Sequence, residues 1–176
     1  MELRRPSKAD EIAILEMIDD FQRHDSSMDG AWHIDMDSWD YDRWLESNQA
    51  QEMGFNGTPA IQFVAFDGQN PVGFVHLRLR LTESLRHRGG HIGYSTRPTE
   101  RGRGYAKKML ALALDIASQK NIKQALLTCH EKNEASRRVI LANGGLLETK
   151  EAGIERYWIP LERINDETSK MEHSKT

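Results

Sequence analysis

Residues 101–106 read Arg-Gly-Arg-Gly-Tyr-Ala, and they join a strand-like stretch to a strongly apolar helix. The stretch 90–96 precedes them, and residues 107–119 carry apolar side chains at helical spacing. A helix begins with unpaired backbone N–H groups and partial positive charge, and glycine lets an anion approach that backbone closely. The loop therefore predicts a phosphate-binding site at a helix start. Three basic side chains add positive charge there: Arg101, Arg103 and Lys107.

Two common nucleotide-binding motifs do not fit this loop. A Walker A loop continues Gly-Lys-Ser/Thr after its last glycine, whereas this chain continues Gly-Tyr-Ala-Lys over 104–107, with no hydroxyl placed for magnesium. A Rossmann turn needs a third glycine and a later ribose-binding carboxylate, and here the next strand ends in Cys129-His130. The phosphate site therefore belongs to another class.

The pattern Arg-x-x-Gly-x-Ala at 101–106 resembles the coenzyme A pyrophosphate loop of the GNAT acetyltransferase superfamily, whose signature is Gln/Arg-x-x-Gly-x-Gly/Ala. The following segments are similar too, since the strand-like run 124–130 precedes a short helix that Asn133 opens and a Gly-Gly pair ends. Upstream, 92–98 resembles the fourth family strand, which splays from its neighbour and offers backbone groups to the pantetheine arm. Independent turns and caps have no reason to repeat this order of elements.

The resemblance implies an α/β GNAT fold, with a mixed, mostly antiparallel central sheet of about six or seven strands flanked by about four helices. It also implies an acetyl-CoA-dependent N-acetyltransferase, in which a primary amine attacks the acetyl thioester directly. The alternative is a non-catalytic acyl-CoA-binding regulatory module on the same fold. Gly-Gly-His-Ile-Gly-Tyr at 89–94 is similar to a group of small, poorly characterised bacterial predicted acetyltransferases. Homodimers formed through the C-terminal strands are common in this family.

The resemblance also assigns residues to the acetyl-CoA site. We expect the fourth strand, the glycine-containing loop and the start of the short helix to form it: Tyr94, Ser95, Thr96, Arg101, Gly102, Arg103, Gly104, Tyr105, Ala106, Lys107, Asn133 and Ser136. No metal is expected.

The catalytic positions depart from the family pattern. Seven residues after Asn133, where many members carry a tyrosine acid, this chain has Ile140, and one usual glutamate position is Thr128. His91 is a candidate base, because the reference pKa of histidine is about 6.5. Its alternative is a hydrogen-bonded histidine within the strand.

Three further side chains are candidates for the chemistry. Tyr94 could donate a proton to a departing thiolate or simply pack. Ser136 could lie near the coenzyme sulfur or cap its own helix. Cys129 could form an acetyl-thioester, but no histidine–carboxylate relay is identifiable, so we expect a small buried residue.

The segment between residues 19 and 46 is strongly acidic, with nine carboxylates against two arginines. The carboxylates are Asp19, Asp20, Asp25, Asp29, Asp35, Asp37, Asp40, Asp42 and Glu46. Aromatic residues lie among them: Trp32, Trp39, Tyr41 and Trp44. In the family this region forms one wall of the acceptor groove, and the composition suits a cationic small molecule or peptide. The alternative is a solvated acidic loop with tryptophans packed beneath it.

Composition favours one cytoplasmic, enzyme-sized domain. At 176 residues with 38% hydrophobic content, the chain can bury a core but is short for two domains. A single cysteine excludes an intramolecular disulfide and a cysteine-based zinc cluster. The N-terminus lacks an apolar signal core, and no apolar run approaches the length of a membrane span. The net charge of −3 argues against nucleic-acid binding.

Periodicity predicts a strand, two helices, three strands, a helix, a strand, a helix and two strands. The first helix is expected over 7–24, and the second is expected to start at Ser38. The buried face of the first helix is predicted to carry Ile12, Leu15, Ile18 and Ala9. The hairpin strands are expected at 60–66 and 72–81, and the last pair at 146–150 and 154–161. The acetyltransferase domain would span 1–161, and 162–176 would be a disordered polar tail.

Overall fold

The computed structural model describes residues 1–34, 38–55 and 57–161. Within these ranges, seven strands form a four-stranded sheet in the order β1-β2-β3-β4 and a three-stranded sheet in the order β5-β7-β6. Every ladder in them is antiparallel. The strands are β1 Glu2–Arg4, β2 Ala60–Asp67, β3 Asn70–Arg78, β4 Ile92–Thr96, β5 Gln124–His130, β6 Leu146–Glu151 and β7 Ile154–Pro160. The expected number of strands is confirmed.

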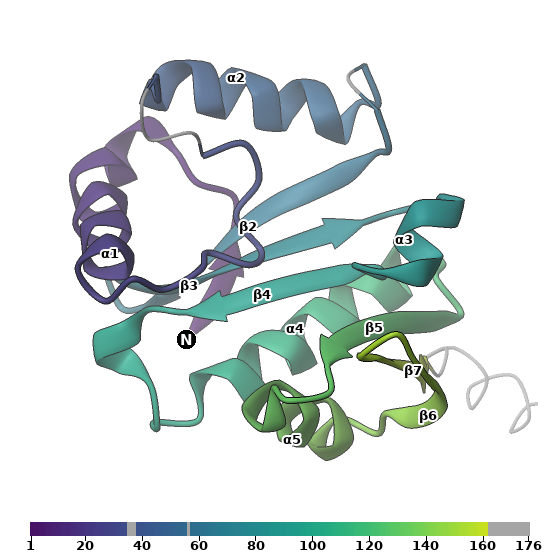
Figure 1. The fold of residues 1–176 in the computed structure, drawn as a ribbon. Coiled ribbons are helices and arrows are strands. Elements are labelled where there is room, and N and C mark those ends of the chain that lie inside the picture. Colours follow the sequence, from purple (N-terminus) through teal and green to yellow (C-terminus); the bar gives the residue numbers. More distant parts are fainter. Residues whose placement is uncertain (35–37, 56, 162–176) are drawn as a thin grey trace, which may run out of the picture.

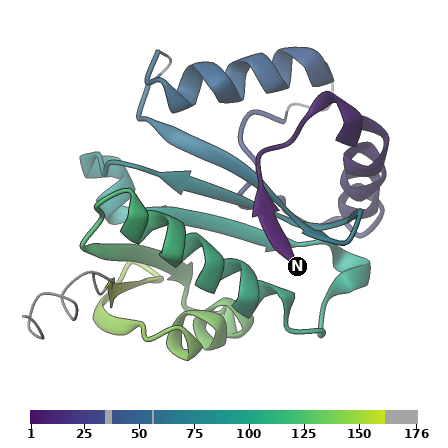
Figure 2. The same cartoon turned by 180° about the vertical axis from the view of Figure 1, so that it is seen from behind.

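Five α-helices in the described ranges flank these sheets, with a short 3-10 turn before the first and another before the fourth. The helices are α1 Glu11–Arg23, α2 Tyr41–Glu52, α3 Glu83–His87, α4 Tyr105–Gln119 and α5 Glu134–Ala142. Helices α1 and α2 cover one face of the four-stranded sheet, and α4 covers the other (Figures 1 and 2). None of the helices in the described part of the chain has the length and apolar content to span a bilayer.

The buried face of α1 differs from the predicted one. Ile14, Met17, Ile18 and Phe21 are buried against β2, β3 and α2, at the spacing i, i+3, i+4, i+7. Of the predicted face only Ile18 is buried, whereas Ile12 is 75% exposed, Leu15 is 40% exposed and Ala9 is exposed as well. The prediction was wrong because steps of three residues drift around a helix of 3.6 residues per turn.

Helix α2 begins later than expected. The helix begins at Tyr41, and its N-cap is Asp40, whose carboxylate accepts a hydrogen bond from the Arg43 N–H at 2.9 Å. Serine and aspartate are equally good N-caps, so composition alone does not choose between Ser38 and Asp40.

The chain between β3 and β4 holds an unpredicted helix. Strand β3 ends at Arg78 rather than Leu81, and α3 follows, with the Thr82 hydroxyl accepting from the Leu85 N–H at 3.2 Å. The helix is only five residues long, and too short for a periodic signal. Helix α1 starts at Glu11, after a 3-10 turn at Lys8–Asp10, rather than directly after Ser7. The other expected ends lie within two residues of those observed, as for α4, which starts at Tyr105 rather than Lys107.

His91 joins the two sheets at the entry to β4. Its backbone carbonyl accepts from the Arg78 N–H, and its backbone N–H donates to the Leu126 carbonyl, both at 2.7 Å. The Leu126 N–H in turn donates to His91 Nδ1 at 2.8 Å. After this junction, β4 and β5 form no ladder with each other, and space opens between them.

Candidate active site

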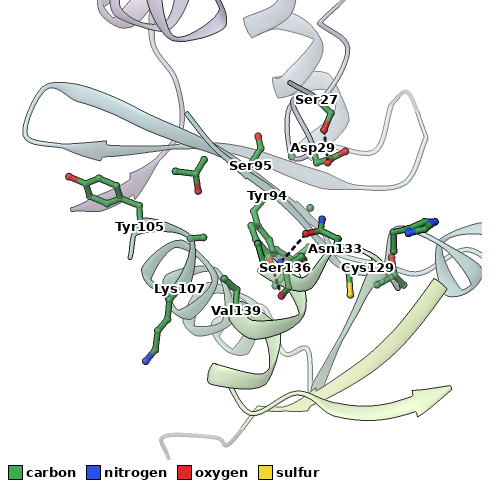
Figure 3. Close-up of a pocket in the computed structure, with 18 of the residues that line it drawn as sticks. Ser27, Asp29, Tyr94, Ser95, Tyr105, Lys107, Cys129, Asn133, Ser136 and Val139 are labelled. Atoms are coloured by element: carbon green, nitrogen blue, oxygen red, sulfur yellow. Dashed lines mark hydrogen bonds between the residues drawn. The ribbon is translucent and has the colours of Figure 1, made fainter. Parts of the chain in front are cut away.

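A cleft of about 750 Å³ lies between β4 and β5 beyond their junction. It is lined by both strands, by the loop before α4, by the first turn of α5 and by the loop between α1 and α2. Figure 3 shows Tyr94 of β4, Ser136 of α5 and Lys107 of α4 around it. All the residues expected at the acetyl-CoA site line this cleft except Arg103.

The glycine-containing loop presents an open backbone surface. Gly102 and Gly104 have φ angles of 77° and 80°, a left-handed conformation that side chains disfavour. A Cβ added at either position would meet nothing within 4 Å, so the space in front of both is free. The Lys108 N–H is the first in α4 to find a backbone carbonyl, that of Gly104 at 3.3 Å. Unpaired N–H groups at a helix start facing open space suit a phosphate.

The two arginines of the loop behave differently. Arg101 lines the cleft, and it donates from Nε to the Thr96 carbonyl at 3.2 Å and from NH2 to the Ser26 hydroxyl at 2.6 Å. Arg103 instead pairs with Glu100 and lies over the Tyr105 ring, 5.4 Å from its centroid. Only the first of these guanidinium groups faces the cleft.

Tyr94 and Ser136, which the sequence named separately, come together in the cleft. Their hydroxyl oxygens are 2.9 Å apart, and Asn133 holds the start of α5 because its side-chain oxygen accepts from the Ser136 N–H at 3.1 Å. Burial raises the pKa of Tyr94 to about 12, although its hydrogen bond with Ser136 lowers it. The phenol therefore keeps its proton at neutral pH and can donate a hydrogen bond.

His91 does not line the cleft, and its Nδ1 lone pair is used by the Leu126 N–H. Burial, with Arg86 and Arg78 nearby, lowers the pKa of His91 to about 4. This geometry supports the alternative of a hydrogen-bonded strand histidine. Its role as a base remains a prediction that no contact in the structure supports.

Cys129 is buried at the cleft wall, as expected, beside the fully buried Glu155. The Glu155 carboxylate accepts from Arg137 Nε at 2.7 Å, pairs with Lys150 Nζ at 2.8 Å and accepts from the Tyr157 hydroxyl at 2.7 Å. Hydrogen bonding to Arg137 lowers the pKa of Glu155 to about 2, so it stays ionised. Burial raises the pKa of the Cys129 thiol to about 11, which leaves little thiolate for nucleophilic attack.

The family's missing catalytic positions have structural roles here. Ile140 is fully buried in the core beneath α5. Thr128 lines the cleft, and its hydroxyl accepts from the Gly89 N–H at 2.9 Å, which ties β5 to the end of α3.

Four of the described carboxylates of the acidic segment have ion-pair or capping partners within the fold. Asp19 pairs with Arg23 and Asp42 with Lys8, and Asp40 caps α2. Asp20 accepts from Arg97 Nε at 3.1 Å and from the Thr99 hydroxyl at 2.6 Å.

Asp29 is the only described carboxylate of this segment that lines the cleft. Asp35 and Asp37 lie outside the described residues. Tyr41 and Trp44 are buried beneath the segment, with Trp39 packed against both rings. The described part of the segment therefore supports the alternative of a solvated acidic loop.

Sequence reasoning missed the basic part of the cleft, which Arg78 of β3 and Arg88 after α3 line. Arg78 is the last residue of β3 and follows seven buried residues, 71–77, in a segment that was expected to continue as a strand to Leu81. Among the described residues, no group of three or more His, Cys, Asp or Glu side chains is arranged to hold a metal ion.

Comparison with known proteins agrees with this geometry. Residues 1–145 match the family model described as an acetyltransferase (GNAT) domain. A comparison with curated proteins found no match.

Several solved structures share the fold. The putative acetyltransferase YncA from Salmonella typhimurium, with its cofactor acetyl-CoA, has a TM-score of 0.60 and 19% identity over 94% of this chain and 96% of its own. Mycobacterium smegmatis RimJ in complex with CoA-disulfide has a TM-score of 0.67 and 20% identity, over 93% and 83%. A mutant of the spermidine N-acetyltransferase SpeG from Vibrio cholerae has a TM-score of 0.61 and 18% identity, over 94% and 98%.

Proposed function

Because this chain belongs to the GNAT acetyltransferase family, we propose that it transfers an acetyl group from acetyl-CoA to a primary amine by direct attack on the thioester. The observation that carries the proposal is the open backbone surface at Gly102 and Gly104, inside the cleft and at the start of α4. YncA, which has the same fold, was solved with acetyl-CoA, and SpeG is named as a spermidine N-acetyltransferase.

The residues of the cleft fit acetyl-CoA. The N–H groups from Gly102 to Ala106 would hold the pyrophosphate, with Lys107 and Arg101 supplying positive charge. The backbone of β4 from Tyr94 to Thr96 lines the cleft and has no partner strand on the β5 side. Apart from the Thr96 carbonyl, which accepts from Arg101, the N–H and C=O groups on that side suit the amides of a pantetheine arm.

The chemistry requires an amine nitrogen to attack the acetyl carbon while the carbon–sulfur bond breaks. Tyr94 and Ser136 form a hydroxyl pair that would donate a hydrogen bond to the departing sulfur. Because the pKa of Tyr94 is about 12, above the thiol reference of about 8.5, the phenol proton stays on oxygen. The proton that the amine releases is then the one that the thiol gains, directly or through water. This arrangement requires no base at His91.

The alternative, a non-catalytic acyl-CoA-binding module, draws on one observation: Ile140 is a core residue and provides no acid. Measuring free coenzyme A on addition of amines separates the two hypotheses. An enzyme releases thiol only when acceptor and acetyl-CoA are both present, with one acetylated amine formed for each thiol. Calorimetric binding of acetyl-CoA, with no thiol release across amino acids, polyamines, aminoglycosides and peptide N-termini, would support the module.

The charge of the acceptor is a separate question. The cationic acceptor expected from the acidic segment has little support from the described residues, because three of its carboxylates form ion pairs within the fold and Asp40 caps α2. The charges that line the cleft away from the glycine-containing loop are those of Arg78, Arg88 and Asp29.

A further inference from the structure

Between β3 and β4 the chain is rich in arginine that has no acidic partner. Residues 78–91 contain four arginines and one carboxylate, Glu83. None of these arginines forms an ion pair with any described residue, although ion pairs are frequent elsewhere, as at Arg4, Arg97 and Arg137. The four are Arg78, Arg80, Arg86 and Arg88. The segment therefore carries uncompensated positive charge, and two of its arginines line the cleft.

Arg78 is the most deeply placed of the four. Its NH1 group donates to the Gly89 carbonyl at 3.0 Å and to the Gly90 carbonyl at 3.2 Å, which fixes the plane of the guanidinium. Its Nε and NH2 groups have no hydrogen-bond partner among the described residues, and burial lowers its pKa. A cation removed from water without a counter-charge is costly, and a bound anion would offset that cost.

The free edge of Arg78 also indicates the shape of the anion. Nε and NH2 are adjacent donors on one side of a planar group, and this fork matches the two oxygens of a carboxylate. NH2 lies 3.6 Å from the position that a Cβ on Gly93 would occupy, next to Tyr94 in β4. Successive residues of a strand project from opposite faces, so Arg78 and Tyr94 approach β4 from its two sides, and both line the same cleft as Ser136.

We propose that the acceptor bears a carboxylate within a few bonds of its amine, as an amino acid does, and that Arg78 and Arg88 bind this carboxylate. This inference rests on the proposed function, because it concerns the acceptor of the same transfer. Arg78 supplies the bidentate contact, and Arg88, an exposed residue at the rim, adds charge. Asp29 lines the cleft from the loop whose Gly30 packs on Gly93, and it offers the opposite charge to the ammonium form of the amine.

The test compares L-amino acids with the corresponding L-amino acid amides and with spermidine, using the full chain and acetyl-CoA. Coenzyme A release gives kcat and KM, and calorimetry gives the acetyl-CoA affinity. The variants are Arg78→Gln and Arg88→Gln, and the matched control is Arg80→Gln, an exposed arginine of the same segment that does not line the cleft. Thermal unfolding checks Arg78→Gln for folding, and the exposed Arg88 supplies a second variant without buried contacts.

We expect at least one amino acid to exceed its amide by about 10-fold or more in kcat/KM, the scale of a charged hydrogen bond. Arg78→Gln should raise KM for the amino acid by a similar factor, leave the amide unchanged and keep acetyl-CoA affinity. Arg88→Gln should cause a smaller rise, and Arg80→Gln none. The carboxylate site would be overturned if amides or spermidine gave the same kcat/KM as amino acids. It would also be overturned if Arg78→Gln and Arg80→Gln raised KM for the amino acid equally.

Failure of the proposed function gives a different result, in which acetyl-CoA binds but no amine releases thiol. Calorimetric titration of the amino acids into the protein with coenzyme A then decides about the carboxylate site. Binding that Arg78→Gln abolishes and Arg80→Gln preserves supports the site. The absence of amino acid binding overturns it.

Discussion

Gly104 lies at φ 80°, where the chain enters α4 and where a side chain would project into free space. Gly68, in the turn between β2 and β3, has φ 63° and equally free surroundings, so it is a matched control outside the cleft. A valine at either position should cost about 1–2 kcal/mol of unfolding free energy through left-handed strain. Only Gly104→Val should weaken acetyl-CoA binding, by about 10-fold or more, because its side chain blocks the backbone N–H groups. Calorimetry measures the affinities, and unchanged binding to folded Gly104→Val would contradict the proposed pyrophosphate site.

The hydroxyl pair gives a second prediction at this scale. Tyr94→Phe and Ser136→Ala each remove one partner of the 2.9 Å contact, and each should lower kcat by about 10-fold while acetyl-CoA affinity stays unchanged. The double variant should lose little more than either single variant, because the two groups act as a unit. Steady-state kinetics with a saturating amine test this, and fully additive losses would show that the hydroxyls act separately.

At the scale of elements, His91 connects β4 to β5. His91→Ala leaves the buried Leu126 N–H without an acceptor and should cost about 1–3 kcal/mol of unfolding free energy in urea denaturation. Since the imidazole is neutral at neutral pH, the acidic limb of the kcat/KM profile should not change. Loss of that limb in folded His91→Ala would restore the histidine as a base.

The sequence predicted features that neighbouring residues determine. It did not predict contacts between residues that are far apart in the chain. The glycine-containing loop could be predicted, because a positive φ and a helix start are properties of neighbouring residues. The Tyr94–Ser136 contact joins residues 42 apart, and the His91–Leu126 bond joins residues 35 apart. Arg78 was missed for the same reason. The sequence does not show that no described carboxylate lies near its guanidinium in the fold, and this is what suits it to bind an anion.

At the scale of the whole molecule, two buried carboxylates make stability depend on pH. Hydrogen bonds from Arg4 and Arg137 lower the pKa of Asp10 and Glu155, respectively, to about 2, from ordinary values of 3.8 and 4.5. Folded pKa values below the unfolded ones mean that their contribution is complete above about pH 4.5 and is lost as pH falls toward 2. Urea denaturation from pH 7 to pH 2.5 should show this decline.

Glu155→Gln should make that decline shallower, and it should also lower stability at pH 7, because Arg137 and Lys150 lose a shared counter-charge. Glu148→Gln is the control, since it alters a more exposed pair, that with Arg156, on the same sheet. Equal acid sensitivity in the wild type and Glu155→Gln would show that Glu155 does not govern it.

The gap between β4 and β5 divides the backbone hydrogen bonding of the molecule into two halves, one for each sheet, which His91 joins at one end and which share one hydrophobic core with helix α4. A substrate bound in the gap would form the hydrogen bonds that β4 lacks on its β5 side. It would thereby connect the two halves. Amide hydrogen exchange should therefore slow on both sides when acetyl-CoA is added, in β4 and in the β5–β7 hairpin, and the melting should become more cooperative. Slower amide exchange confined to the loop at 101–106 would show that bound acetyl-CoA does not connect the two halves.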